Sequence, residues 1–240
     1  MPATKADIIL QLKKDILALQ GFKTLANNEQ SVAGLGPINE AFPNSVFPLG
    51  AVHEFICEKT EDVSASTGFI TGILSSLMEK AGVSVWISSS PVIFPPSLKA
   101  FGVSPDKMIF IHLPKENDIL WTIEEALKCE GLAAVIGELP KISFTESRRL
   151  QLAVERSRVT GFILCHHNRN TTACVTRWKI SHCPSLEADM PGVGFPRWNV
   201  ELSKVRNGKP GSWQVEWVAG RFRHMPVITP VLGAQHKKTG

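Results

Sequence analysis

The sequence predicts an α/β protein whose mostly parallel sheet is flanked by helices and extended by antiparallel strands at its C-terminal end. Two patterns predict this class. From residue 51 to residue 165, short apolar runs alternate with amphipathic segments, as in parallel β-α units with helices on both faces of a sheet. After residue 165 the helical period disappears and three strand-like segments follow, ACVTRWKI, PRWNVELSKV and GSWQVEW, the last two joined by a glycine-containing turn at residues 207–211.

The parallel section is expected to contain five strands with helices between them. A capping box, Ser143 with Glu146 three residues later, marks the start of the last of these helices. Glycines at the ends of apolar periods predict where the other helices stop. In order along the chain we expect strand 51–57, helix 65–81 ended by Gly82, strand 83–88, a short helix from Pro96 to Gly102, a strand from Met108, a helix capped by Asn117 or Asp118 and ended by Gly131, strand 132–139, a helix from Ser143 to about Val159, and strand 161–165.

The two ends of the chain are expected to lie outside this core. Apolar residues on one helical face predict a detachable helix over residues 5–20, within an N-terminal segment 1–26. Asparagines, glycines and prolines without a clear period predict a linker at 27–49, before a core at 50–218. Residues 219–240 are expected to form a flexible tail.

Composition favours a cytoplasmic globular protein. A chain of 240 residues can bury a full core, and no apolar run approaches the roughly 20 residues that span a bilayer, so we expect neither a membrane anchor nor a signal peptide. The five cysteines are odd in number and have no C-x-x-C spacing, which is typical of reduced thiols.

Charge is divided unevenly along the chain. Residues 1–140 contain 10 lysines and 16 acidic residues, a net charge of −6, whereas residues 141–240 contain 16 basic and 6 acidic residues, a net charge of +10. All ten arginines lie at or after Arg148. We therefore expect the C-terminal part to face a polyanion or an acidic protein surface; the alternative is that the cations only solvate a β-rich end.

The loop between the first expected strand and its helix lies where a G-x-x-x-x-G-K-[ST] phosphate-binding loop would stand. Within FICEKTEDVSASTGF there is no glycine before Gly68, although glycines allow backbone N–H groups to surround a phosphate. Lys59 and Thr60 are expected to follow the strand too closely to lie at the helix N-terminus. Carboxylates of Glu58, Glu61 and Asp62 would repel a nucleotide there, so we expect no cofactor. The degenerate loop positions are Glu58, Lys59, Thr60, Ser66 and Thr67.

Several segments in a fixed order resemble the ImuA family, RecA-like accessory proteins of SOS-linked mutagenic repair that are distantly related to the cell-division inhibitor SulA. The segments lie within residues 45–218 and are LGAVHEF, STGF, FPPSLKAFGVSPDK, WTIEEALKCEGLAAVIGEL, TESRRLQLAVERS, TRWKI, PRWNVEL and GKPGSWQVEW. The resemblance implies a RecA-like core of the P-loop NTPase type. It also implies an ImuB-like Y-family polymerase homologue as partner and, with it, an error-prone replicative polymerase α subunit; RecA is a further expected partner.

Positions at which RecA-like ATPases act are changed in this sequence. Where the resemblance places a catalytic glutamate, the chain has Ser88, Ser89 and Ser90, none of which is a base. Glu138 stands at the Walker B position, but magnesium usually needs nucleotide phosphates as co-ligands, so we interpret Glu138 as vestigial. His167 lies near the position that senses the terminal phosphate. Together these changes predict a protein that is not an enzyme.

Cysteines and histidines between residues 165 and 183 suggest a zinc site, but their spacing matches no zinc motif. Cys165 is expected to point inward as an ordinary core cysteine. A Cys-His nucleophile is disfavoured because adjacent residues of a strand point to opposite faces. We therefore expect no metal site and no catalytic residue.

Tryptophans of the C-terminal strands stand among arginines and lysines, an arrangement that could stack bases and bind phosphates of single-stranded DNA. For the tryptophans we favour the alternative that an antiparallel sheet buries them at alternate positions. The tryptophans are Trp178, Trp198, Trp213 and Trp217. The candidate contacts with DNA or with an acidic partner are Arg148, Arg149, Arg177, Arg197, Lys204 and Arg206.

The leading hypothesis is a non-catalytic adaptor in SOS-induced translesion DNA synthesis. Two alternatives stay open: a weak ATPase or recombination mediator that acts with RecA, and a SulA-like inhibitor of cell division.

Overall fold

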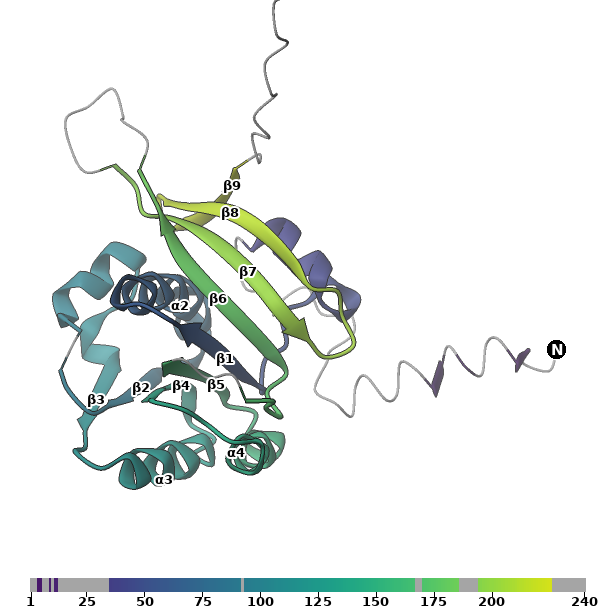
Figure 1. The fold of residues 1–240 in the computed structure, drawn as a ribbon, viewed down its shortest axis with the longest axis horizontal. Coiled ribbons are helices and arrows are strands. Elements are labelled where there is room, and N and C mark those ends of the chain that lie inside the picture. Colours follow the sequence, from purple (N-terminus) through teal and green to yellow (C-terminus); the bar gives the residue numbers. More distant parts are fainter. Residues whose placement is uncertain are drawn as a thin grey trace, which may run out of the picture.

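The computed structural model describes residues 35–91, 93–166, 170–185 and 194–225, together with Thr4, Lys5, Ile9, Gln11 and Leu12 (Figure 1). Of the helix predicted over residues 5–20, Lys5, Ile9, Gln11 and Leu12 have helical backbone, and the other positions lie outside the described residues. No helix within the described ranges is long and apolar enough to span a bilayer.

One mixed sheet runs through the described core in the order β3-β2-β4-β5-β1-β6-β7-β8-β9. Every pairing from β3 to β6 in this order is parallel, and every pairing from β6 to β9 is antiparallel. The predicted α/β class with an antiparallel C-terminal extension is therefore confirmed. The strands are β1 Val52–Cys57, β2 Val83–Ser88, β3 Met108–His112, β4 Leu132–Leu139, β5 Thr160–His166, β6 Thr176–Cys183, β7 Arg197–Val205, β8 Gly211–Val218 and β9 Arg221–Met225.

Helices cover both faces of the parallel section. α3 (Glu116–Leu127) and α4 (Phe144–Ser157) lie on one face, where their apolar residues share a core with alternate residues of β2, β4 and β5. α2 (Thr60–Ala81) lies on the opposite face, as Figure 1 shows, and packs into a second, larger core. The two cores follow from the period of two along each strand, which sends successive side chains to opposite faces.

The helix boundaries differ in part from the prediction. The capping box is confirmed, since Glu146 N donates to Ser143 Oγ (3.2 Å) and Ser143 N donates to Glu146 Oε2 (2.7 Å). α3 begins earlier than predicted, with Lys115 rather than Asn117 or Asp118 as its N-cap. The short helix near residue 96 is a 3-10 helix, η4 (Pro95–Phe101), followed by another, η5 (Pro105–Lys107).

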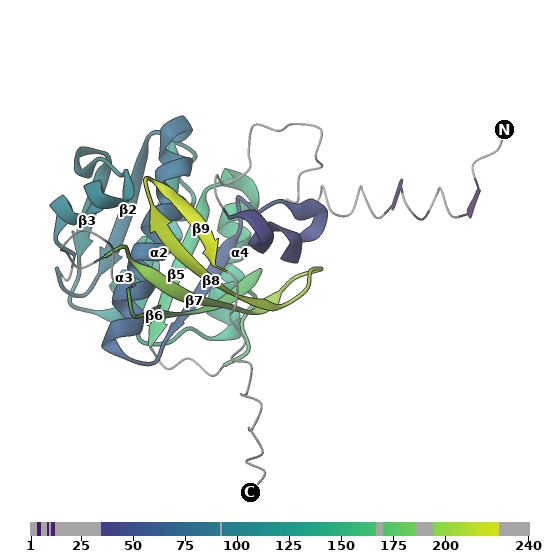
Figure 2. The ribbon, with the colours of Figure 1, turned by 90° about the horizontal axis from the view of Figure 1, so that it is seen from above.

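The antiparallel strands curl over α2 rather than extending the sheet away from the core (Figure 2). Phe222 and Trp217 reach α2 at Gly72, where a Cβ atom would lie 2.6 Å from Phe222 Cζ and 2.9 Å from Trp217 Cζ3. Trp198 lies against Gly68 in the same way. α2 is thereby enclosed between the parallel sheet and β7 to β9.

The predicted linker at 27–49 is wrong for its described part. Residues 35–49 contain two 3-10 helices, η2 (Gly36–Ala41) and η3 (Pro43–Ser45), and their apolar side chains enter the larger core. His224 Nε2 donates to Leu35 O (2.8 Å), which fastens this segment to β9. Four apolar residues among the glycines and prolines of this segment anchor it in the core although they follow no regular period: Leu35, Ile38, Phe42 and Phe47 are all buried.

The predicted tail at 219–240 is also wrong for its described part, because β9 occupies residues 221–225 and pairs with β8. Apolar and charged residues alternate in RFRHM, and Phe222 is buried. Residues 226–240 lie outside the described residues.

Candidate functional site

The loop between β1 and α2 is the first candidate site, because it joins a strand to a helix as phosphate-binding loops do. α2 begins at Thr60 with Lys59 as its N-cap, five residues earlier than predicted. Lys59 and Thr60 therefore do lie at the helix N-terminus, and the contrary expectation is wrong. The missed signal is an acidic residue at the third helical position, Asp62, which can bond to the chain before the helix.

Asp62 closes the start of α2. Its Oδ2 atom accepts hydrogen bonds from the backbone N–H groups of Glu58 (3.1 Å) and Lys59 (3.0 Å), and the side chain is 5% exposed. Glu58 is held by Lys179, whose Nζ atom lies 2.8 Å from Glu58 Oε2. Glu61 adds a further carboxylate to the first turn. The backbone N–H groups of Glu58 and Lys59, which could bind an anion, are thus engaged by the protein's own carboxylate.

The later loop positions face the interior. Ser66 is fully buried and lies 3.5 Å from the Cys57 Sγ atom, while the carbonyl of Thr67 accepts a hydrogen bond from Thr71 Oγ1 (2.7 Å). Burial raises the pKa of the Cys57 thiol to about 11, so Cys57 is a protonated core residue at neutral pH.

The predicted Walker B position and the predicted position of a catalytic glutamate lie near the ends of two neighbouring strands, Glu138 on β4 and Ser88 on β2. Glu138 Oε1 accepts a hydrogen bond from the indole Nε1 of Trp86 (2.7 Å), and burial raises the pKa of this carboxyl group. Ser88 Oγ donates to Ser90 O (2.8 Å) and lies 3.2 Å from His112 Nδ1. Glu138 thus fixes a core tryptophan, and the serines bond to one another.

Three of the five cysteines, Cys57, Cys165 and Cys174, lie in the core, whereas Cys183 is partly buried and Cys129 is exposed. Cys165 and Cys174 are fully buried, which confirms the inward position of Cys165, and burial raises the pKa of the Cys174 thiol to about 12. Within the described ranges no group of three or more histidines, cysteines and acidic residues is placed to hold a metal ion. His167 lies outside the described residues.

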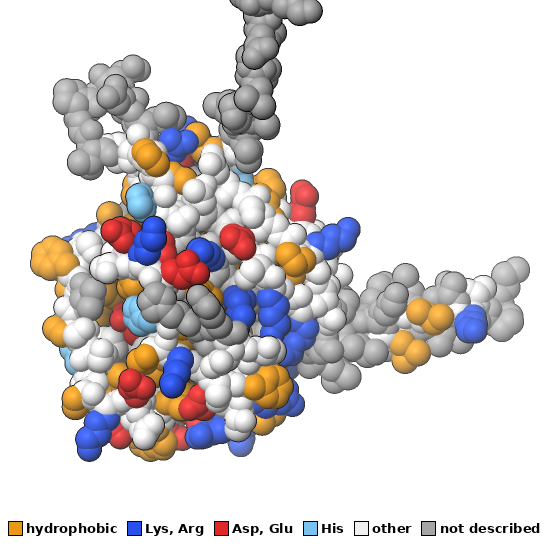
Figure 3. Space-filling model, in the orientation of Figure 1, with side chains coloured by type: hydrophobic (Ala, Val, Ile, Leu, Met, Phe, Trp, Pro, Cys, Tyr) orange, Lys and Arg blue, Asp and Glu red, His pale blue; other side chains and the backbone are white. Residues whose placement is uncertain are grey.

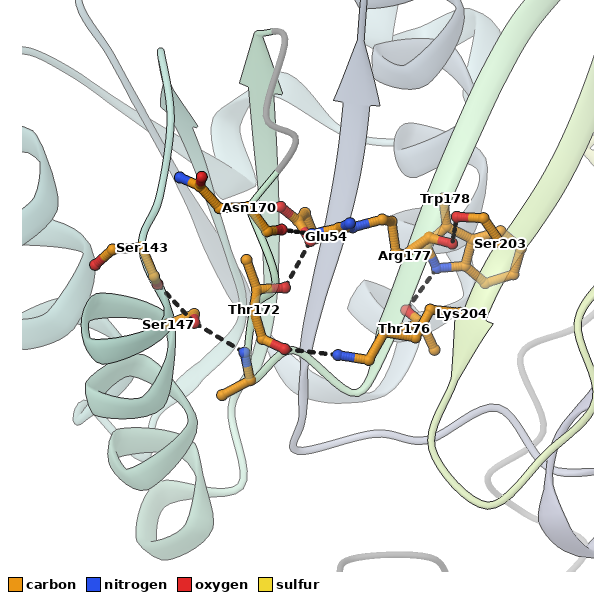
Figure 4. A network of polar contacts seen from close by, with 11 residues as sticks. Glu54, Ser143, Ser147, Asn170, Thr172, Thr176, Arg177, Trp178, Ser203 and Lys204 are labelled. Carbon is orange, nitrogen blue, oxygen red and sulfur yellow. Dashed lines mark hydrogen bonds and ion pairs between the residues drawn. The ribbon is translucent and has the colours of Figure 1, made fainter.

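A buried charge network on the α4 side of β1 was not predicted. Glu54 is fully buried; its Oε2 atom lies 2.8 Å from Arg177 Nε on β6 and accepts a hydrogen bond from Thr172 Oγ1 (2.7 Å) (Figure 4). The signal was present, because Glu54 is the acidic residue of the apolar run VHEFIC. A buried carboxylate needs a charged or hydrogen-bonding partner, which the run itself does not supply.

Three predicted DNA or partner contacts hold the return segment between β5 and β6. Arg177 donates to Asn170 O, Lys204 Nζ to Thr172 O (2.6 Å) and Arg206 Nη2 to Ala173 O (2.8 Å). Burial lowers the pKa of Lys204. Figure 4 shows Arg177 and Lys204 reaching Asn170 and Thr172 of this segment, beside α4. These cations perform an internal task that their sequence pattern did not reveal.

The remaining predicted contacts separate into two places. Arg197 lies on β7, where its Nη1 atom donates to Pro184 O (3.1 Å). Arg148 and Arg149 are exposed on α4. On the face shown in Figure 3, cationic side chains are interspersed with acidic and apolar ones.

The tryptophans are mainly core residues. Trp178, Trp198 and Trp217 are at most 4% exposed, and Trp213 is partly buried against the same core. The favoured burial at alternate positions is confirmed for Trp178 on β6 and Trp198 on β7. Trp217 on β8 is buried too, but its neighbours Val215 and Glu216 are also buried, so β8 does not alternate there.

Comparison with known proteins identifies relatives. No family model matches the chain. Protein ImuA of Caulobacter vibrioides strain NA1000 / CB15N is 33% identical over 193 residues, in an alignment that covers 73% of this chain and 78% of the relative. Protein ImuA of Caulobacter vibrioides strain ATCC 19089 / CIP 103742 / CB 15 matches with the same identity and coverage. The chain therefore belongs to the ImuA family.

Proposed function

We propose that this protein is a non-catalytic accessory protein of SOS-induced, error-prone translesion DNA synthesis that acts in the cytoplasm with an ImuB-like Y-family polymerase homologue. Membership of the ImuA family is the observation that carries the proposal. An error-prone replicative polymerase α subunit and RecA are further proposed partners, and single-stranded DNA is a proposed ligand.

We also propose that the parallel section is a RecA-like core that no longer hydrolyses nucleotides. Three contacts support this. A phosphate at the start of α2 would have to displace the buried Asp62 carboxylate from the N–H groups of Glu58 and Lys59. Glu138 is engaged by Trp86, and Ser88 bonds to the backbone of Ser90 instead of offering a base.

Nucleotide binding separates the adaptor from the weak ATPase. Titration of the full chain with ATP and Mg²⁺ in a calorimeter is expected to give no binding heat, with a RecA preparation as the positive control. Saturable heat together with phosphate release would contradict the adaptor proposal in favour of the ATPase.

The repair role is tested in the organism. Deleting the gene for this chain is expected to lower the frequency of ultraviolet-induced mutation, and a plasmid copy is expected to restore it. Purified ImuB-like protein is expected to be retained by the tagged full-length chain. An unchanged mutation frequency would overturn the repair assignment.

A further inference from the structure

α3 and α4 form a groove on the surface of the protein, away from the β1–α2 loop. The groove has a volume of about 460 Å³ and is lined by residues of both helices and of the end of α3, among them Glu124 of α3, its C-cap Lys128, and Arg149, Leu152 and Arg156 of α4. Arg149 pairs with Glu124 across the two helices.

Three large apolar side chains are exposed on α3 and α4, and one of them, Leu152, lines the groove. Leu152, in the groove, is 49% exposed; Phe144, at the start of α4, is 56% exposed; and Trp121, one turn before Glu124 and Glu125 on α3, is 61% exposed. They belong to the outer faces of helices whose inner faces already fill the core. Exposed apolar side chains on adjoining elements are typical of interaction surfaces.

Cations outnumber carboxylates in the lining of the groove, which holds Lys128, Arg149 and Arg156 against Glu124 and Glu130, and Arg148 lies on α4 outside this lining. Glu124 is paired with both Arg149 and Lys128. Arg148 and Arg156, both exposed on α4, form no ion pair with any described residue. In Figure 3, cationic and apolar side chains adjoin over the position that α4 has in Figure 1.

We propose that the α3–α4 groove binds an acidic amphipathic helix of a protein partner. Apolar residues of that helix would cover Leu152 and Phe144, and its carboxylates would pair with Arg148 and Arg156, as in helix-in-groove recognition. A nucleic acid fits less well, because Glu124 and Glu130 line the groove and the exposed apolar side chains offer nothing to a phosphate backbone. The chain's own first 34 residues carry four lysines and three acidic residues, so they lack the complementary charge.

The experiment compares matched variants and rests on the proposed function for its first probe, the purified ImuB-like protein. Leu152→Ser and the double variant Arg148→Glu/Arg156→Glu are each expected to weaken binding at least 10-fold, about 1.4 kcal/mol. Only the double variant, which changes charges, is expected to reduce the dependence of binding on salt as well. Phe94→Ser and Lys99→Glu/Lys107→Glu change exposed residues elsewhere and are expected to bind like wild type. Thermal melts check that each variant is folded.

The outcomes separate the surface from the function. If wild type and the α4 variants bind equally well, the groove proposal is overturned and the adaptor role stands. If wild type does not bind the ImuB-like protein, the proposed adaptor role loses its partner. The groove proposal is then tested with a fluorescein-labelled helical peptide that has leucines on one face and glutamates on the other. Saturable binding of this peptide that Leu152→Ser and Arg148→Glu/Arg156→Glu abolish supports the groove, and no saturable binding overturns it.

Two further readouts oppose the proposal. The first is binding of a labelled thymidine 30-mer. If wild type binds this oligonucleotide and Arg148→Glu/Arg156→Glu does not, while both bind the protein partner equally well, the groove is a nucleic-acid site. A wild-type dimer in sedimentation that becomes a monomer in Leu152→Ser would instead assign the groove to a second copy of the chain.

Discussion

Glu54 lies on β1 and Glu58 directly follows that strand, but the two carboxylates differ in their exposure to solvent. Glu54 is fully buried against Arg177, whereas the side chains of Glu58 and Lys179 are 52% and 39% exposed. Removing one partner of a buried ion pair leaves an uncompensated charge, which costs far more than breaking an exposed pair.

Glu54→Gln is therefore expected to lower the free energy of unfolding by about 3 kcal/mol, and Glu58→Gln by less than about 1 kcal/mol, in urea denaturation at neutral pH. Glu54→Leu combined with Arg177→Met should recover much of the loss, because it removes both charges. Equal effects of the two single variants would contradict the buried network.

His53 shows how a titratable side chain is kept neutral in the core. Its Nε2–H donates to Pro48 O (2.9 Å), because a carbonyl can only accept. Nδ1 therefore accepts from the hydroxyl of Thr176 (2.7 Å), and that hydroxyl accepts from the indole of Trp178 (2.7 Å). Burial lowers the pKa of His53 to about 3.

This pKa predicts a pH dependence of stability. Between pH 6.5 and about pH 3 the unfolded chain binds a proton at His53 that the folded chain does not, so the free energy of unfolding falls as pH falls through this window. The contribution reaches about 1.4 kcal/mol per pH unit. His53→Gln is expected to flatten the dependence measured by urea denaturation at pH 7, 6, 5 and 4.5. The exposed His182→Gln serves as control, and parallel curves for His53→Gln and wild type would contradict the assignment.

At the scale of elements, the strands β7 to β9 pack so closely on α2 that they leave little room for a Cβ atom at two of its positions, Gly68 and Gly72. Alanine at an exposed position inside a helix is more stable than glycine by roughly 1 kcal/mol. At Gly72 the added Cβ would lie 2.6 Å from Phe222 Cζ. Because of this close contact with β9, we expect alanine at position 72 to lower the free energy of unfolding instead of raising it.

Gly72→Ala is expected to lower the free energy of unfolding by about 1–3 kcal/mol, since the added methyl group overpacks the contact with β9. Combining it with Phe222→Leu should cost less than the sum of the two single changes. Gly131→Ala, where nothing lies within 4 Å of the added Cβ, is the control. A stabilised Gly72→Ala would contradict the enclosure of α2.

The start of α2 illustrates an element whose type is predictable and whose boundary is not. The apolar period of the helix becomes clear only near residue 65, because the preceding turn is polar. Asp62 starts the helix earlier by bonding to the backbone before it. The apolar period of a sequence therefore does not show where a helix begins when a polar side chain, here Asp62, fixes its first turn.

At the scale of the molecule, β9 joins both halves of the chain. Phe222 packs on α2, Arg223 pairs with the buried Glu216 of β8, and His224 bonds to Leu35. The contact between His224 and Leu35 joins residues that are 189 positions apart in the sequence.

A chain that ends at Val218 is therefore expected to lose about 3 kcal/mol or more of unfolding free energy relative to a chain that ends at Met225, the size of deleting one large aromatic residue from a core. Thermal melting by circular dichroism of the two truncated chains measures the difference. Identical midpoints would show that β9 does not support the core.

The sequence alone determines the order and type of the β-α units, because their apolar periods and the Ser143 cap are local signals. Family membership also rests on the sequence. Only the tertiary structure decides which polar residues are internal: Glu54, Arg177 and Lys204 meet from positions 54, 177 and 204, and no local pattern encodes their contact. The same holds for the segment 35–49 and for β9. Their apolar residues become part of the core only in the folded molecule, where they pack against residues that are distant in the sequence.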